Sequence, residues 1–197
     1  MLSYQTAFVK MMEHSIYMSF YKYGNARKTY PLLAQANKCV QERLDYYING
    51  KPFKNIAPHN KDYLIDVANF AMLEAMFPNS GSSPFAKPDA SSGWQADFST
   101  SFVRDAMDSS PSVLSGNYEA SERLNLIQQY LDLYNSIKGS VNLSYIIYLA
   151  CEEFNSPSFE DAFHNINIAG DSLSPGLAGG ISYKELMGSN DGYIHYE

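Results

Sequence analysis

Five oxygen-bearing side chains on two neighbouring predicted helices are the residues of this sequence best suited to chemistry. The helices, residues 31–49 and 61–77, are joined by a short connector, so they are expected to form an antiparallel hairpin. Residues equally distant from the turn then lie level, which brings Asp45 close to Asp66. Carboxylates, together with water, are the ligands that Mg²⁺ prefers. The five residues are Glu42, Asp45, Asp62, Asp66 and Asn69.

Two interpretations of these residues are open. In the catalytic interpretation, Glu42, Asp45 and Asp66 carry the chemistry and a metal ion is held by Asp45, Asp62 and Asp66. In the structural interpretation, Asp66 and Asn69 are half-buried polar groups on a helix that is apolar on nearly every side, and they need partners. Arg43 on the first helix is then the expected partner of Asp66. Glu42 points away from the apolar stripe of its helix and Asp45 flanks that stripe, so both are then solvated.

The connector between the two helices is basic and rich in proline. It carries Lys51 and Lys54, and Lys61 follows at the start of the next helix. Together with Asn69, these lysines are the alternative ligand-binding residues, because their charges could meet phosphate. Three lysines on a proline-rich connector are usually part of a solvated loop, so direct binding of nucleic acid is not expected.

Other motifs that carry chemistry are missing from the sequence. The histidines at positions 14, 59, 164 and 195 have no metal-ligand spacing. There is no nucleophile elbow, phosphate-binding loop or dinucleotide fingerprint, and the glycines at 176–180 are expected to form a surface turn. The sequence therefore contains no complete catalytic motif, and a protein that is not an enzyme is favoured.

Helical periodicity of apolar residues predicts an all-α fold, a helical bundle of about six to seven helices with a loop-rich C-terminal tail. Phe8, Met12, Ile16 and Phe20, for example, recur at four-residue spacing in the first helix. The helices expected to form the core are residues 2–22, 31–49, 61–77 and 117–138. Shorter helices are expected at 97–108, at 142–154, near Ser158 and near 184–187.

A stretch rich in Ser, Gly and Pro is the only plausible internal boundary. The predicted organisation is a helical hairpin unit at 1–78, a loop at 79–96, a second helical unit packed on the first at 97–168, and a loop-like tail at 169–197. The triplet Glu-Arg-Leu occurs at 42–44 and again at 122–124. Whether residues 97–165 are a duplication or an insertion stays open.

Composition places the chain among globular proteins. Hydrophobic residues make up 45% and charged residues 18% of its 197 residues. Cys39 and Cys151 have no metal-binding or redox spacing and are expected to be reduced, buried thiols. We recognise no signal peptide and no apolar run long enough for a membrane span. The expected location is the cytoplasm of a host bacterial cell, with no membrane partner.

Charge is divided unequally along the chain. Residues 1–61 carry nine Lys and Arg against three acids, whereas residues 101–197 carry four against thirteen. This asymmetry is typical of two surfaces with different electrostatic partners, or of two ends that attract each other within one fold. An acidic surface on the C-terminal half could occupy the basic channel of a nucleic-acid-binding enzyme.

Four segments of the chain resemble small proteins of bacteriophages and mobile elements. The segments are Tyr21–Arg27, Glu42–Tyr46, Asn60–Met72 and Asp171–Tyr183. In such proteins the N-terminal and C-terminal segments stand closer together, which makes residues 97–165 similar to an inserted unit. The resemblance implies a phage or mobile-element accessory protein.

The hairpin also distantly resembles the all-α, MazG-like nucleotide pyrophosphohydrolases. Those enzymes bind Mg²⁺ with an ExxE pair on one helix and an ExxD pair on the next. Glu42-Arg-Leu-Asp45 has the ExxD spacing, while the partner helix offers Asp62, Asp66 and Asn69 in place of a matching pair. This resemblance implies Mg²⁺ as the cofactor and nucleotides as the substrates.

Two functions from different classes therefore follow from the sequence. The leading expectation is an accessory protein that binds a macromolecular partner, a host or phage protein, and inhibits a host defence or nucleic-acid-processing protein through an acidic surface. The alternative is a Mg²⁺-dependent nucleotide pyrophosphohydrolase or nucleotide-binding protein. If the protein is an accessory protein, no cofactor is expected. A homo-oligomer is compatible with either function.

Overall fold

The computed structural model describes residues 1–26, 36–78, 93–111 and 120–156. The chain divides into two compact units, Met1–Asn155 and Ser156–Glu197, and the second unit is described at Ser156 alone. The helical architecture is therefore that of the first unit. The helices expected near Ser158 and near 184–187, and the expected tail at 169–197, lie outside the described residues.

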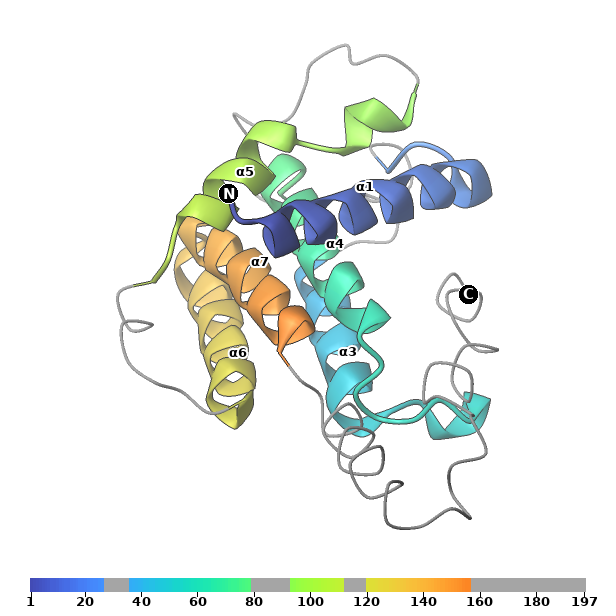
Figure 1. The fold of residues 1–197 in the computed structure, drawn as a ribbon, viewed down its shortest axis with the longest axis vertical. Coiled ribbons are helices and arrows are strands. Elements are labelled where there is room, and N and C mark those ends of the chain that lie inside the picture. The colour runs from blue at the N-terminus through green and yellow to red at the C-terminus, as the bar shows by residue number, and fades with distance from the viewer. Residues whose placement is uncertain (27–35, 79–92, 112–119, 157–197) are drawn as a thin grey trace, which may run out of the picture. The chain divides into compact units, whose positions relative to one another are not determined.

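The described residues form α-helices and two short 3-10 helices (Figure 1). The α-helices are α1 (Ser3–Tyr23), α3 (Ala36–Asn49), α4 (Asp62–Met76), α5 (Thr100–Asp108), α6 (Ala120–Ile137) and α7 (Ser140–Asn155). The 3-10 helices are η1 (Pro52–Lys54) and η2 (Trp94–Asp97). Apart from one isolated bridge between Lys51 and Ile56, this part of the chain contains no β-structure. The all-α prediction is confirmed.

The periodic stripes in the sequence located these helices within a few residues of their bounds. The predicted start of the second helix, residues 31–35, lies outside the described residues. A difference that the structure does describe lies at the end of the stretch predicted to be a loop, residues 79–96. There the chain turns into η2, and the N-cap of α5 follows at Ser99, whose hydroxyl accepts a hydrogen bond from the Phe102 N–H at 3.3 Å. The short cap and turn residues, rather than an apolar stripe, set this boundary.

Helix α4 forms the centre of the unit. It packs against α3, α7 and α1, and Figure 1 shows it running behind α1 toward α3. Between Tyr63 and Met76, every side chain except those of Asp66 and Phe70 is buried. The sequence-based expectation that this helix is apolar on nearly every side is therefore correct. A helix with so little polar surface needs neighbours on several sides, and the other helices supply them.

Helices α6 and α7 form a second antiparallel pair, joined at Gly139. Helix α7 also packs against α4, α5 and α1. It therefore contributes to the same hydrophobic core as each of these helices. Ile127 and Leu131 of α6 and Ile146 and Ile147 of α7 are inaccessible to solvent. These contacts join the described part of residues 97–168 to residues 1–78 in a single core.

Two buried carboxylates tie the helices together through polar contacts. The Tyr134 hydroxyl of α6 donates to Glu74 of α4 at 2.5 Å. On α7, Glu153 accepts from the Tyr47 hydroxyl of α3 at 3.0 Å and from Arg123 Nε of α6 at 2.8 Å. Because such groups are costly to bury without partners, these contacts fix which helices can lie next to one another.

Cys151 is buried, whereas Cys39 is only partly buried, and the buried thiol is expected to be much less reactive than a thiol in an unfolded chain. Burial raises the pKa of Cys151 to about 12, with a smaller contribution from Glu152, and burial also raises the pKa of Cys39. At pH 8 the thiolate of Cys151 should be about a thousandfold rarer than that of a free cysteine, and only thiolates react. Titration with a disulfide reagent should label Cys151 only after denaturation. Rapid labelling of Cys151 in the native protein would contradict this packing.

Candidate functional site

The α3–α4 hairpin contains an ion pair at the position where the sequence placed its candidate carboxylates. Arg43 Nε lies 3.6 Å from Asp66 Oδ2, and the two side chains are 19% and 15% exposed. The Arg43 guanidinium also lies 5.7 Å from the ring centres of Tyr46 and Phe70. The ion pair between Asp66 and Arg43 that the structural interpretation expects is therefore present. A cation already stands beside the carboxylate that the catalytic interpretation would use for a metal ion.

Glu42 and Asp45 lie on the solvent-exposed side of α3 and are engaged by neighbours on their own helix. The Tyr46 hydroxyl donates to Glu42 Oε1 at 2.7 Å, and this hydrogen bond is the main cause of the raised pKa of Tyr46. Gln41 Nε2 donates to Asp45 Oδ1 at 3.0 Å. Both contacts span four residues, the spacing at which side chains meet on a helix surface. The expectation that these two carboxylates are solvated agrees with this geometry.

Asn69 and Asp62 lie at opposite ends of the α4 segment that carries the candidates. Asn69 is 5% exposed, and its Nδ2 donates to the Met12 carbonyl oxygen of α1 at 3.2 Å. Its amide is therefore used inside the core, against α1. Asp62 begins α4, and its backbone N–H donates to Asn60 Oδ1 at 3.1 Å, which satisfies one of the free N–H groups of the helix start.

The described residues do not bring the proposed metal ligands together. Within them, no group of three or more His, Cys, Asp and Glu side chains could hold a metal ion. Asp66 faces Arg43, Asp45 is bonded to Gln41, and Asp62 lies at the helix start. The Mg²⁺ site remains a prediction from sequence.

A substitution of Asp66 separates the two interpretations by the sign of its effect. Asp66→Asn should lower the free energy of unfolding by about 1–3 kcal/mol, because Arg43 loses the carboxylate that faces it. Mg²⁺ should change the melting temperature of neither protein. Thermal melts of wild type and variant, with and without Mg²⁺, measure this. A variant that melts higher than wild type in the absence of Mg²⁺, with a Mg²⁺ effect confined to wild type, would support the metal site instead.

The connector between α3 and α4 has a tightly tied backbone. Lys51 N–H donates to the Ile56 carbonyl at 2.8 Å, and Ile56 N–H donates to the Lys51 carbonyl at 3.1 Å. Inside this loop, Asn55 adopts the left-handed conformation with φ 55° and closes η1. Ile56 is buried, and the His59 N–H donates to the Tyr47 carbonyl at 2.7 Å. The loop is thus anchored at both ends to the hairpin.

This tied loop exposes Phe53 completely. The Phe53 side chain has a relative exposure of 101%, the largest of any large hydrophobic residue in the described parts of the chain. Lys54 follows it directly and is also exposed. The folded unit gains no hydrophobic stabilisation from Phe53, although fully burying such a side chain contributes about 1.5–3 kcal/mol. Single exposed hydrophobic side chains are common on protein surfaces, but Phe53 stands on a loop whose backbone is hydrogen-bonded to itself.

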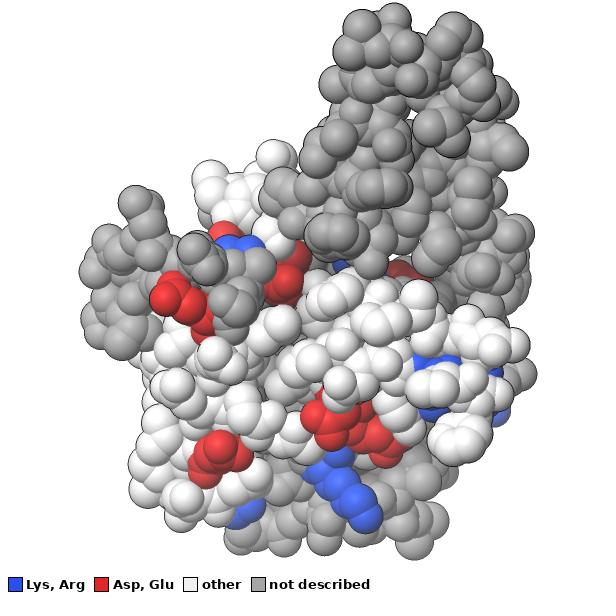
Figure 2. All heavy atoms as spheres, turned by 90° about the horizontal axis from the view of Figure 1, so that it is seen from below, with Lys and Arg blue, Asp and Glu red and all other residues white. Residues whose placement is uncertain are grey.

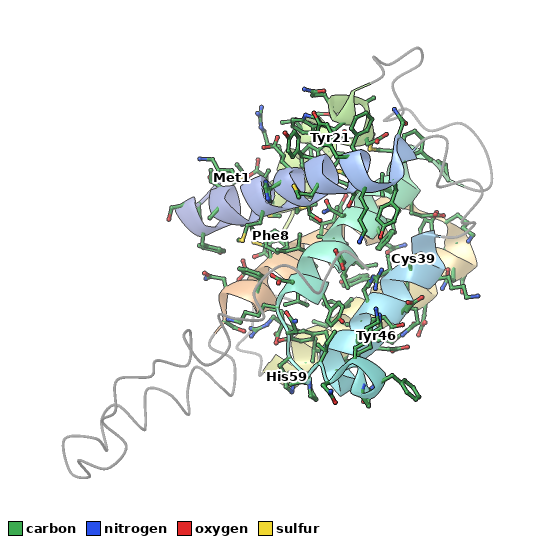
Figure 3. The ribbon with its side chains drawn as sticks, turned by 90° about the vertical axis from the view of Figure 1, so that its right-hand side faces the viewer. Met1, Phe8, Tyr21, Cys39, Tyr46 and His59 are labelled. Atoms are coloured by element: carbon green, nitrogen blue, oxygen red, sulfur yellow. The ribbon has the colours of Figure 1, made fainter. Side chains whose placement is uncertain are left out.

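The other two lysines of the connector lie over aromatic rings. Lys51 Nζ is 4.3 Å from the centre of the Tyr46 ring, and Lys61 Nζ is 5.9 Å from that of Phe154. In Figure 3, His59 of the connector and Tyr46 of α3 lie at the same end of the hairpin. No acidic residue occurs between Asp45 and Asp62, so the charged residues of the connector are all basic.

These lysines are the residues that the sequence proposed for ligand binding, together with Asn69. The structure does not group Asn69 with them, because its amide is buried against α1 rather than at the connector. The lysines therefore form a surface feature of the loop, and Asn69 is part of the core.

Sequence reasoning missed Phe53 and identified only the lysines around it. The signal was present, because Pro52-Phe53-Lys54 places one aromatic residue in a polar, proline-bearing connector. A lone phenylalanine in such a loop is equally typical of an anchor that folds back onto the core. The structure shows that Phe53 is exposed rather than folded back onto the core, on a loop closed by backbone hydrogen bonds.

Comparison with protein-family models, with curated proteins and with solved structures finds no match to this chain. The described helices contain no segment that is long and apolar enough to cross a membrane.

Proposed function

We propose that the protein acts by binding a macromolecular partner and that the α3–α4 connector contacts this partner. The proposal keeps the expected role of a phage or mobile-element accessory protein whose partner is a host or phage protein. The observation that carries it is the complete exposure of Phe53 on a loop whose backbone is tied by hydrogen bonds. Because the backbone of this loop is ordered before binding, it loses little conformational freedom on binding, which favours affinity.

The chemistry of the connector indicates what the partner presents. Phe53 requires an apolar pocket, and Lys54 beside it favours carboxylates on the pocket rim. Lys51 and Lys61 add positive charge to the same loop. The proposed partner surface is therefore a small apolar pocket bordered by acidic side chains.

Inhibition of a host defence or nucleic-acid-processing protein through an acidic surface remains part of the proposal. Its support is the excess of acidic residues in the C-terminal half of the sequence. Among the described residues of that half, the exposed acids belong to α5 and α6 and are Asp105, Asp108, Glu122 and Asp132. On the face drawn in Figure 2, acidic and basic side chains form small groups separated by uncharged ones. The α3–α4 connector therefore supports the binding proposal more strongly than the acidic residues do.

The proposal is tested by comparing three versions of the tagged full-length protein as bait in bacterial lysate. Phe53→Ser removes the exposed ring, while Ile137→Ser is a matched control that removes another hydrophobic side chain, 68% exposed at the end of α6. A partner held by wild type and by Ile137→Ser should be retained about tenfold or more weakly by Phe53→Ser, as expected for the loss of about 1.5–3 kcal/mol. Retention should also fall with salt, because the lysines are screened.

Two results would overturn the proposal. One is equal retention of every captured protein by wild type, Phe53→Ser and Ile137→Ser. The other is the absence of any captured protein at low and at high ionic strength.

A further inference from the structure

The connector between α3 and α4 contains most of the left-handed backbone that the structure describes. Five described residues have positive φ, and three of them lie in the connector. These are Gly50 with φ 73°, Asn55 with φ 55° and His59 with φ 66°. Glycine adopts this conformation freely, whereas other residues are disfavoured in it because their Cβ approaches the following carbonyl oxygen. Non-glycine residues held in this conformation are concentrated at functional sites, which makes Asn55 and His59 candidates for a role in function.

Asn55 closes the turn that carries Phe53. An antiparallel bridge joins Lys51 to Ile56, and η1 and Asn55 fill the turn between them. The Lys51 carbonyl accepts a hydrogen bond from the Lys54 N–H at 3.0 Å and from the Ile56 N–H at 3.1 Å. A left-handed residue at the end of a helix turns the chain back on itself. The conformation of Asn55 therefore allows the Ile56 N–H to return to Lys51.

The same turn buries one apolar side chain and exposes the other. Ile56 is 9% exposed, whereas Phe53 is 101% exposed. The hydrophobic effect by itself favours burial of both, because removing apolar surface from water is favourable. The backbone of the turn must therefore keep Phe53 away from the core. This backbone depends on position 55, where positive φ disfavours most residue types.

The exit of the connector is fixed to the core. The His59 N–H donates to the Tyr47 carbonyl at 2.7 Å, and the rings of the two residues lie edge-on with their centres 5.4 Å apart. Tyr47 is 1% exposed, and its hydroxyl donates to Glu153 of α7. Because the exit is anchored in this way, a change of conformation at Asn55 acts on the turn rather than on the packing of the helices.

We propose that Asn55 is a positioning residue for partner binding, because its left-handed backbone holds Phe53 in the exposed position that the partner contacts. This role rests on the function proposed for the connector. Asparagine is one of the few residues with a side chain that enter the left-handed region readily. A residue that avoids this region shifts the loop toward conformations in which the bridge between Lys51 and Ile56 is open. The partner then binds only the fraction of molecules with a closed turn, and the apparent affinity falls by that fraction.

Three substitutions in the full chain separate a role of the Asn55 backbone from a role of its side chain. Asn55→Val introduces a β-branched side chain, which is strongly disfavoured at positive φ. Asn55→Gly removes the side chain but leaves the left-handed conformation free. Ala57→Val is the matched control, because Ala57 is an exposed connector residue without positive φ. Ala57 also precedes a proline, where extended backbone is favoured and a β-branched residue fits.

Amide hydrogen exchange tests the turn without a partner. The Ile56 N–H, which closes the bridge, should exchange about tenfold or more faster in Asn55→Val than in wild type. In Asn55→Gly and Ala57→Val its exchange should stay within about threefold of wild type. Circular dichroism should show the same helix content in all four proteins. An Ile56 N–H that exchanges equally fast in Asn55→Val and in wild type would overturn the role of Asn55.

Retention of a partner tests the positioning itself. The same proteins serve as bait in bacterial lysate, and the captured protein that Phe53→Ser loses is followed. Asn55→Val should retain it about tenfold or more weakly than wild type, and Asn55→Gly and Ala57→Val should retain it within about threefold of wild type. Equal retention by Asn55→Val and wild type, or an equally strong loss in Asn55→Gly and Asn55→Val, overturns the positioning role alone. If wild type captures no such protein, the proposed function itself fails, whatever the exchange rates are.

Discussion

Replacing Arg123 with methionine should lower the free energy of unfolding by about 3–5 kcal/mol, among the largest effects expected of a single substitution in this protein. Arg123 Nε lies 2.8 Å from Glu153 Oε2, and the two side chains are 16% and 6% exposed. The variant keeps the length and apolar stem of the arginine but removes the cation that faces a buried carboxylate. Urea denaturation followed by circular dichroism measures the change.

Two matched variants show whether the loss comes from the unpaired charge. Glu153→Gln keeps an acceptor for the Tyr47 hydroxyl and should cost only about 1–2 kcal/mol. The double variant Arg123→Met with Glu153→Leu should recover part of the stability that Arg123→Met loses, because no charge is left buried. If Arg123→Met costs less than about 1 kcal/mol, well below the range for a broken buried pair, the pair does not stabilise the packing of α6 against α7.

The second large effect is expected at Gly50, where the connector leaves α3. Gly50 has φ +73°, and a Cβ there would lie 2.6 Å from the Ile56 carbonyl oxygen and 2.8 Å from Pro58 N. Gly50→Ala should therefore cost about 2–4 kcal/mol, from backbone strain together with the clash. Thermal or urea unfolding measures this loss, and the connector should also lose the backbone hydrogen bonds that tie Lys51 to Ile56.

Gly24 provides the control for backbone strain alone. It has φ +81°, and no atom lies within 4 Å of the position its Cβ would take. Gly24→Ala should destabilise the protein less than Gly50→Ala, since a residue at a helix end with open space around it can readjust. Equal losses at the two positions would mean that the close approach of Ile56 to Gly50 is unimportant.

The helices could be predicted from sequence because each carries an apolar stripe that depends only on local spacing. The same reasoning placed Asp66 on a nearly all-apolar helix and identified Arg43 as its partner, since both lie near one turn. The polar contacts between distant segments were not predictable in this way. Tyr134 and Glu74 are 60 residues apart, and Arg123, Tyr47 and Glu153 come from three helices. Such pairs depend on which helices become neighbours.

The functional surfaces were harder to predict than the fold. Periodicity reveals the apolar face of a helix, such as the face of α1 with Phe8 and Met12, which is buried, but it does not show which exposed residues contact a partner. Phenylalanine is usually a core residue, so its type gave no sign that Phe53 would be exposed. Its exposure depends on the path of the connector, whose backbone is closed by hydrogen bonds. The spacing of Glu42 and Asp45 made them candidate catalytic residues. In the structure, each accepts a hydrogen bond from a side chain on the surface of its own helix.

The most direct test of the binding proposal is site-specific photocrosslinking from position 53. Benzoylphenylalanine replaces Phe53 in one version of the full chain and Ile137 in a control version, and both are illuminated in bacterial lysate. The proposal predicts a specific crosslinked protein from position 53 that is absent from position 137 and is displaced by an excess of unmodified protein. Crosslinks that are identical from the two positions, or that Phe53→Ser protein displaces as well as wild type does, would contradict a partner contact at the α3–α4 connector.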